Sequence, residues 1–161
     1  MLAALVLLQA LHYYPQLPAV MASHFDGAGR PNGWQTKGAF FATAGGVVLL
    51  LLLVFLVLPP SLSRLPPRFV NLPHKAYWLA PERRAESWQW FAGHMATFGC
   101  ATLLVVLVTF QLAIHANLSG GGTLPSTPMW ILLAGYLAFA GAWIVRTYRR
   151  FGRPPVGASS V

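Results

Sequence analysis

The sequence predicts an all-α membrane protein with about four transmembrane helices and a small turn-rich extracytoplasmic lobe between the first two helices. The segment 38–58 contains no charged side chain and is a nearly continuous block of Leu, Val and Phe from Val47 onward. About 20 such residues, rising about 1.5 Å each, match a hydrocarbon core of roughly 30 Å. Charged residues make up only 9% of the chain, whereas soluble domains contain about a quarter.

The first two helices are predicted from segments 1–14 and 38–58. About 14 helical residues span only about 21 Å, so the first helix must extend toward Pro15, or the true start codon must lie upstream. A signal peptide is the competing interpretation, but the segment has no basic start and no small-residue cleavage pattern. The second helix is expected to end at Pro59 and Pro60, which lack amide donors.

The third helix is predicted from about Trp88 to about His115, with Pro81 in a helical turn before it. The fourth is predicted from about Met129 to about Val145, where a basic cluster follows. These helices divide the chain into four parts. They are a first helix pair with its outer loop (1–58), a basic cytoplasmic loop (59–87), a second helix pair (88–146) and a cytoplasmic tail (147–161).

The basic residues predict an orientation in the membrane. Because they flank apolar segments, the net charge of +8 indicates membrane topology rather than nucleic-acid binding. Nine of the eleven Lys and Arg residues lie between the second and third helices or after the fourth, and only Arg30 and Lys37 lie elsewhere. By the positive-inside rule, the 59–87 loop and both termini are cytoplasmic, so the 15–37 and 116–128 loops are outside.

The outer loop 15–37 is expected to fold as a compact lobe rather than a free linker. Asp26-Gly27 and Asn32-Gly33 are turn dipeptides, since Gly and Asn tolerate positive φ. A short apolar run precedes them. We therefore expect an extended or hairpin-like piece, with Trp34 at the membrane surface.

A set of motifs in this part of the chain resembles a known family. The motifs are Leu17-Pro18, His24-Phe25, Gly29, Gly33-Trp34 and Lys37, ahead of an apolar helix. They closely resemble the bacterial membrane family called domain of unknown function 1648, over about residues 5–58. The segment 71–84 resembles the stretch that often follows in short members. The module is also similar to the N-terminal part of SdpI-type immunity proteins, which implies the bacterial cytoplasmic membrane and a role in immunity or signalling.

Three residues are candidates for a metal site at the outer face. His24 and Asp26 lie two residues apart in the loop, and His115 lies at the outer end of the third helix, so imidazole and carboxylate ligands could converge on zinc. The favoured alternative is that His24 and Asp26 form hydrogen bonds within the loop, with Asp26 in an Asx turn. His12 and His94 are expected on opposite sides of the midplane, which disfavours a shared haem.

The densest charge cluster in the sequence is a candidate partner-binding surface. It consists of Glu82, Arg83, Arg84 and Glu86. Its position predicts docking of a cytoplasmic protein or of anionic lipid headgroups. The alternative is a solvated helix start in which Arg83 pairs with Glu86 three residues later.

Catalysis is not expected from this sequence. Asp26 is expected outside and Glu82 and Glu86 inside, so no acid/base pair can form across the membrane. No phosphate-binding loop, zinc-protease motif or serine with a neighbouring base is present, and no cofactor is predicted. The leading hypothesis is a non-enzymatic membrane protein that recognises a ligand or a membrane or cytoplasmic partner, with no role for nucleic acid. The alternatives are a small structural subunit of a larger complex and metal or small-ligand binding at the outer face.

Overall fold

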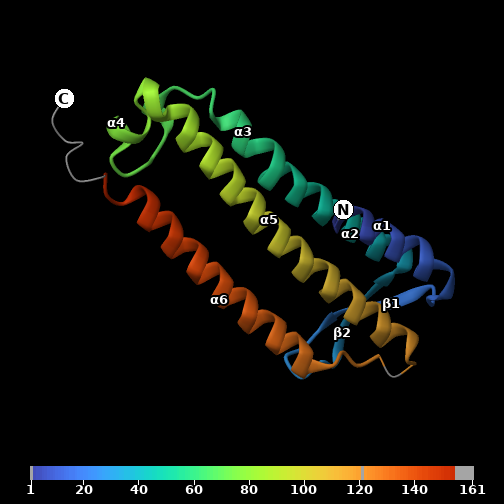
Figure 1. Cartoon of the computed structure of the whole chain (residues 1–161). Coiled ribbons are helices and arrows are strands. Elements are labelled where there is room, and N and C mark those ends of the chain that lie inside the picture. Colours follow the sequence, from blue (N-terminus) through green and yellow to red (C-terminus); the bar gives the residue numbers. More distant parts are fainter. Residues whose placement is uncertain (1, 121, 155–161) are drawn as a thin grey trace. The chain divides into compact units, whose positions relative to one another are not determined.

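A computed structural model describes residues 2–120 and 122–154 of the chain (Figure 1). The structure divides into two compact units, each built from segments that are distant in sequence. Unit 1 comprises segments 1–51 and 100–136, and unit 2 comprises segments 52–99 and 137–161. The helices α5 (Pro81–Leu118) and α6 (Ser126–Phe151) contribute residues to both units.

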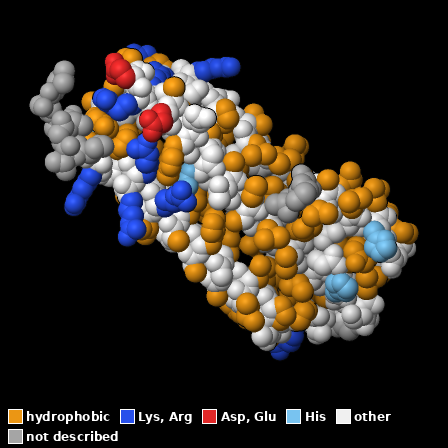
Figure 2. All heavy atoms as spheres, viewed as in Figure 1, with side chains coloured by type: hydrophobic (Ala, Val, Ile, Leu, Met, Phe, Trp, Pro, Cys, Tyr) orange, Lys and Arg blue, Asp and Glu red, His pale blue; other side chains and the backbone are white. Residues whose placement is uncertain are grey.

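Three helical segments in the described part of the chain are long and apolar enough to cross a membrane. They are Lys37–Leu62, α5 and α6, with 26, 38 and 26 residues, where about 20 suffice. Hydrophobic side chains cover much of their surface (Figure 2). These helices suit a multi-pass membrane protein. Helix α1 (Leu2–Tyr13) has 12 residues, so it is shorter than a full crossing, as its apolar segment indicated.

The prediction that Pro59 and Pro60 end the second helix is wrong. Helix α2 (Lys37–Leu52) continues through a π-helical segment, Leu53–Val57, into α3 (Leu58–Leu62). The two prolines lie in the first turn of α3, where a proline is best tolerated because its missing N–H costs least. The π-helical segment changes the hydrogen-bond spacing just before them.

Helices α5 and α6 are both longer than predicted. Helix α5 begins at Pro81, as the proline indicated, but it is continuous with the apolar stretch that was expected to start near Trp88. Helix α6 continues past Val145 to Phe151, through the basic cluster. Apolar composition marks only the part of a helix suited to lipid, while polar ends stay helical because their backbone bonds are intact.

The outer loop contains a β-hairpin, where a hairpin-like piece was expected. The protein is therefore not all-α, because it contains this small two-stranded sheet. A 3-10 turn at Tyr14–Gln16 leads to β1 (Val20–Phe25), which pairs antiparallel with β2 (Pro31–Thr36). Met21 faces Gln35, and Ala22 faces Trp34. The register shifts at His24 and Phe25 mark a bulge near the turn.

The core of unit 1 joins the hairpin to two helices. Its fully packed members are Leu17, Met21, Phe40, Ala113 and Ile114. Met21 is completely buried, so one face of β1 is held against the apolar sides of α2 and α5. A two-stranded hairpin is marginally stable alone. This packing therefore provides the burial that keeps it folded.

In unit 2 the predicted basic loop is an ordered segment. It contains a 3-10 helix at Pro67–Phe69 and the short α4 (Lys75–Trp78). The Trp78 indole Nε1 donates to the Phe151 carbonyl at 3.1 Å, and Ser87 Oγ donates to the Trp78 carbonyl at 2.9 Å. Trp78 is buried. These bonds fix α4 between the start of α5 and the end of α6.

Candidate functional site

The hairpin of unit 1 is held along its β1 edge by a side chain of α5. Asn117 Oδ1 accepts a hydrogen bond from the Ala22 amide at 2.7 Å, and Asn117 Nδ2 donates to the Ala22 carbonyl at 2.9 Å. The same Nδ2 also donates to Ala113 within its own helix at 2.8 Å. The side-chain amide of Asn117 thus forms with the Ala22 backbone the two hydrogen bonds that a neighbouring strand would form.

The turn between the strands is organised by Asp26. Its carboxylate accepts hydrogen bonds from the amides of Ala28 and Arg30 and from Arg30 Nε, each at 2.9 Å. The Arg30 amide, followed by the Arg30 side chain and the Ala28 amide, lowers the pKa of the Asp26 carboxyl against the opposing effect of desolvation. This Asx-type geometry is the favoured reading of the sequence.

The turn is also bound to α6 and to the segment just before it. The Leu124 amide donates to the Gly29 carbonyl at 2.8 Å, and Trp130 Nε1 donates to the Gly27 carbonyl at 3.2 Å. Gly29 has φ +81°, and a Cβ at this position would lie 2.0 Å from the Leu124 carbonyl oxygen. Glycine is therefore required here by both conformation and space.

The base of the hairpin is held by Lys37. Its Nζ donates to the carbonyls of Tyr14 and Leu17 at 3.2 and 3.3 Å, and it lies 4.7 Å from the centroid of the Tyr14 ring. The Lys37 ammonium group, at the start of α2, therefore provides a hydrogen-bond donor for two carbonyl oxygens at the 3-10 turn.

The face of the hairpin opposite Met21 is the candidate recognition surface, and we call it the hairpin face. Its residues, paired across the strands, are Val20 with Thr36 and Ala22 with Trp34, and paired residues share a face. Trp34 is 61% exposed and Val20 57%. They border an open hollow of about 510 Å³ whose rim also includes Gln16, Pro31 and Asn117.

The residues predicted as metal ligands lie in unit 1 but do not form a three-ligand cluster. His24 Nδ1 is hydrogen-bonded to Asn32 Oδ1, Asp26 is engaged in its turn, and the ring of His115 packs edge-on to Tyr13 at 6.2 Å. No group of three or more His, Cys, Asp or Glu side chains within residues 2–120 and 122–154 is placed to hold a metal ion.

The predicted charge cluster lies in unit 2, where its arginines bond to neighbouring backbone. Arg83 Nε donates to the Tyr77 carbonyl at 3.0 Å, with its guanidinium 4.0 Å from the Tyr77 ring centroid. Arg84 donates to the carbonyls of Ser63 and Leu65 at 2.8 and 2.6 Å. These two arginines therefore order their own loop, which the sequence interpretation missed.

The acidic members of the cluster behave differently from each other. Glu86 pairs with Arg150 of α6 at 2.7 Å, rather than with Arg83 as the helical spacing suggested. Glu82 is exposed in the first turn of α5, where a carboxylate is favoured by the helix dipole. Both glutamates are exposed, and Glu86 is the one that forms an ion pair.

His94, an isolated candidate in the third predicted helix, is held by α6 within unit 2. Its ring lies between those of Trp90 and Trp143, with centroid distances of 4.4 and 4.5 Å. Its Nε2 lies 3.0 Å from Thr147 Oγ1, and Trp143 Nε1 donates to the His94 carbonyl at 3.0 Å. These bonds hold His94 against α6 within unit 2.

Comparison with known families identifies the N-terminal part of the chain. Residues 1–47 match the family model described as Domain of unknown function (DUF1648). The matched segment covers α1, the hairpin and most of α2, so it includes the motifs that suggested this family. No curated protein and no solved structure matches the chain.

Proposed function

We propose that this chain, whose N-terminal 47 residues match Domain of unknown function (DUF1648), is a non-enzymatic membrane protein that recognises a ligand or a partner protein. The recognising surface is the hairpin face. The observation that supports this proposal is the exposure of Trp34 and Val20 on a hairpin that Asn117 and Lys37 hold in place. The resemblance to SdpI-type proteins implies that this recognition serves immunity or signalling.

The physical argument rests on pre-organisation. A rigid surface loses little conformational freedom when it binds, so more of the contact energy appears as affinity. Tryptophan is among the residues that most often dominate binding energy. Here the Trp34 side chain stands beside a hollow that combines apolar walls with the amides of Gln16 and Asn117. This combination suits an extended peptide or a small amphipathic ligand.

Site-specific photo-crosslinking tests this proposal. A photoreactive phenylalanine analogue at Trp34, introduced into the full chain in its native membranes, is expected to give a discrete crosslinked product. The matched control is the same analogue at Ile131, an exposed apolar residue of α6 in unit 1. Identical products from both positions, or lipid adducts only, would count against recognition by the hairpin face.

The proposed topology has four spans, with both termini in the cytoplasm of a bacterium and the hairpin outside. The nine-to-two distribution of basic residues supports this orientation. Helix α1 supplies the fourth span, with its N-terminus among the lipid headgroups. In a Cys100→Ala background, a membrane-impermeant thiol reagent is expected to label Ala28→Cys in intact cells. It should label Lys75→Cys only after permeabilisation, and the reverse pattern would refute the orientation.

A small structural subunit of a larger membrane complex is the second candidate. Among the described residues, a Cβ added at Gly45, Gly46, Gly135 or Gly141 would have no heavy atom within 4 Å beyond its chain neighbours and its own helix backbone. These surfaces are therefore open to close approach by another helix. Replacement of Gly135 and Gly141 by Leu should then reduce the size of the complex extracted in mild detergent. An unchanged size would leave the recognition proposal as the better account.

A further inference from the structure

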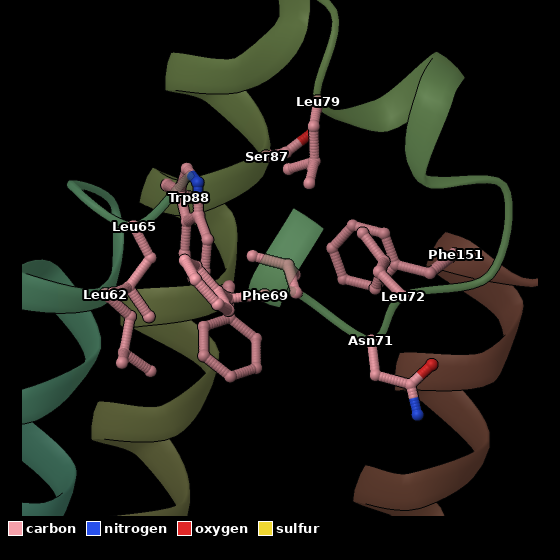
Figure 3. Close-up of a pocket in the computed structure, with 11 residues that line it drawn as sticks. Leu62, Leu65, Phe69, Asn71, Leu72, Leu79, Ser87, Trp88 and Phe151 are labelled. Atoms are coloured by element: carbon pink, nitrogen blue, oxygen red, sulfur yellow. The ribbon is translucent and has the colours of Figure 1, made fainter. Parts of the chain in front are cut away.

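Unit 2 contains an apolar cavity of about 260 Å³. Figure 3 shows its side chains converging from the segment 62–72 and from helices α5 and α6. The walls include Leu65, Phe69, Leu72, Trp88 and Phe151, and the polar residues among them are Asn71 and Ser87. Ser87 Oγ is already bonded to the Trp78 carbonyl. Trp88 Nε1 is buried and has no hydrogen-bond partner among the described residues. The cavity therefore offers a largely apolar interior with this indole N–H in its wall.

Arginines surround this cavity through contacts with its wall residues. The Arg68 guanidinium lies 4.8 Å from the centroid of the Phe69 ring, and Arg84 donates to the Leu65 carbonyl at 2.6 Å. On the other side, the Arg150 guanidinium lies 5.8 Å from the Phe151 ring centroid. Arg68 and Phe69 are both exposed, so the Arg68 charge is available at the surface beside the cavity wall.

The charge of this part of the chain is strongly one-sided. Nine of the eleven Lys and Arg residues lie in the segments that form unit 2, with two of the three acidic residues. Figure 2 shows Lys and Arg side chains gathered with acidic ones in the region that holds α4. One of the two glutamates, Glu86, is already paired with Arg150. The surface around the cavity therefore retains a net positive charge.

We infer that this cavity binds one acyl chain of an anionic lipid, whose phosphate lies against Arg68. The volume is below the roughly 300–1,000 Å³ of pockets that enclose whole drug-sized ligands. It has room for roughly nine groups of the size of a water molecule, which fits part of one acyl chain. Arginine suits phosphate because its planar donors can bind two oxygens at once.

The headgroup must provide the selectivity of such a site. Lipid tails in a bilayer are as apolar as leucine side chains, so moving one chain from the bilayer into the cavity changes its solvation little. An anionic phosphate, by contrast, gains free energy from its attraction to arginines near the membrane surface. Lipids with the same chain and different headgroup charge should therefore differ in affinity.

The test compares two lipids that differ only in their headgroup. The full chain, purified in a neutral maltoside detergent, is mixed with palmitoyl lysophosphatidylglycerol or palmitoyl lysophosphatidylcholine, and bound lipid is counted by native mass spectrometry. We expect one bound lysophosphatidylglycerol per chain and clearly weaker retention of lysophosphatidylcholine. Equal retention of the two lipids would overturn the inference, because the arginines would then not select the headgroup.

Variants locate the two parts of the lipid. Arg68→Gln should weaken lysophosphatidylglycerol binding about fivefold, whereas Arg153→Gln, which removes an exposed charge elsewhere, should not. Leu72→Trp should abolish binding by filling the cavity, with Ile144→Trp on the exposed side of α6 as its control. Val70→Phe is a milder filling if Leu72→Trp does not fold. Full binding by a folded filled variant would show that the chain lies outside the cavity.

Discussion

Asn117 closes the edge of β1 by bonding both backbone groups of Ala22, although the two residues are 95 positions apart in sequence. This contact does for the hairpin what a third strand would do in a larger sheet. It leaves Val20 and Trp34 of the hairpin face exposed, and it removes the freedom of β1 to shift along its partner strand. The stability of the proposed recognition surface therefore depends on a residue outside the family-matched segment.

Replacing Asn117 with Leu should loosen the hairpin. The variant has a similar shape but leaves the Ala22 amide and carbonyl without this partner, which we expect to cost about 1–3 kcal/mol. Hydrogen exchange should accelerate at Ala22 and its neighbours in β1. Ser119→Ala is the control, because Ser119 follows α5 directly and its Oγ donates to the His115 carbonyl of that helix, not to the hairpin. An unchanged exchange rate at Ala22 would show that the core packing of Met21 holds β1 without the hydrogen bonds from Asn117.

Gly29→Ala should destabilise the turn more than Gly27→Ala. At Gly29 the added methyl would collide with the Leu124 carbonyl in a backbone conformation that alanine disfavours. At Gly27 a Cβ would lie in ordinary contact, 3.7 Å from the Trp130 ring. We expect a loss of about 1–3 kcal/mol for Gly29→Ala, seen as a lower unfolding midpoint in detergent. Equal midpoints for the two variants would contradict the geometry.

Arg84→Met should loosen the segment that follows α3. The methionine keeps the length of the side chain but cannot donate to the carbonyls of Ser63 and Leu65. Because these bonds are partly exposed to solvent, we expect a loss of about 1 kcal/mol. Limited proteolysis near Ser63 measures the effect.

Arg64→Met controls for that experiment, since Arg64 is an exposed basic residue of the same segment. It removes the same charge and so has the same influence on membrane orientation. Equal proteolysis rates for Arg64→Met and Arg84→Met would mean that Arg84 acts through its charge alone, and not through its bonds to the backbone.

Asp26 should make the turn acid-sensitive. The pKa of its carboxyl is lowered by the Arg30 amide and the other donors around it. A lowered folded-state pKa stabilises the fold at pH values above the ordinary pKa of about 3.8. That contribution is lost as the pH falls through the lower folded value.

Nuclear magnetic resonance can follow the amides of Ala28 and Arg30 during an acid titration of the protein in detergent. Their shifts should move with a midpoint below the ordinary carboxyl value, and Asp26→Asn should remove this transition. A midpoint at or above the ordinary value would mean that desolvation outweighs the hydrogen bonds to the turn.

Much of the fold could be predicted from local patterns. The apolar block from Val47 indicated a span at 38–58, which the structure extends to 37–62, because lipid selects for length and absence of charge. Pro81 marked the start of α5 because proline suits a first helical turn. Asp26 and the glycine that follows it indicated a turn for equally local reasons. The error at Pro59 and Pro60 arose because a π-helical segment precedes them and they fall in the first turn of α3. Apolar composition does not distinguish such a rare segment from an α-helix.

The sequence by itself indicated a multi-pass membrane protein, the approximate positions of the three long apolar helices and the family whose model matches residues 1–47. These follow from composition and short-range spacing. Only the tertiary structure decided that Asn117 clamps Ala22, that Arg84 binds the carbonyls of Ser63 and Leu65, and that Phe151 closes a cavity beside Phe69. Each of these contacts joins segments distant in the chain. Their partners are chosen by packing in three dimensions, so neither residue type nor spacing reveals them.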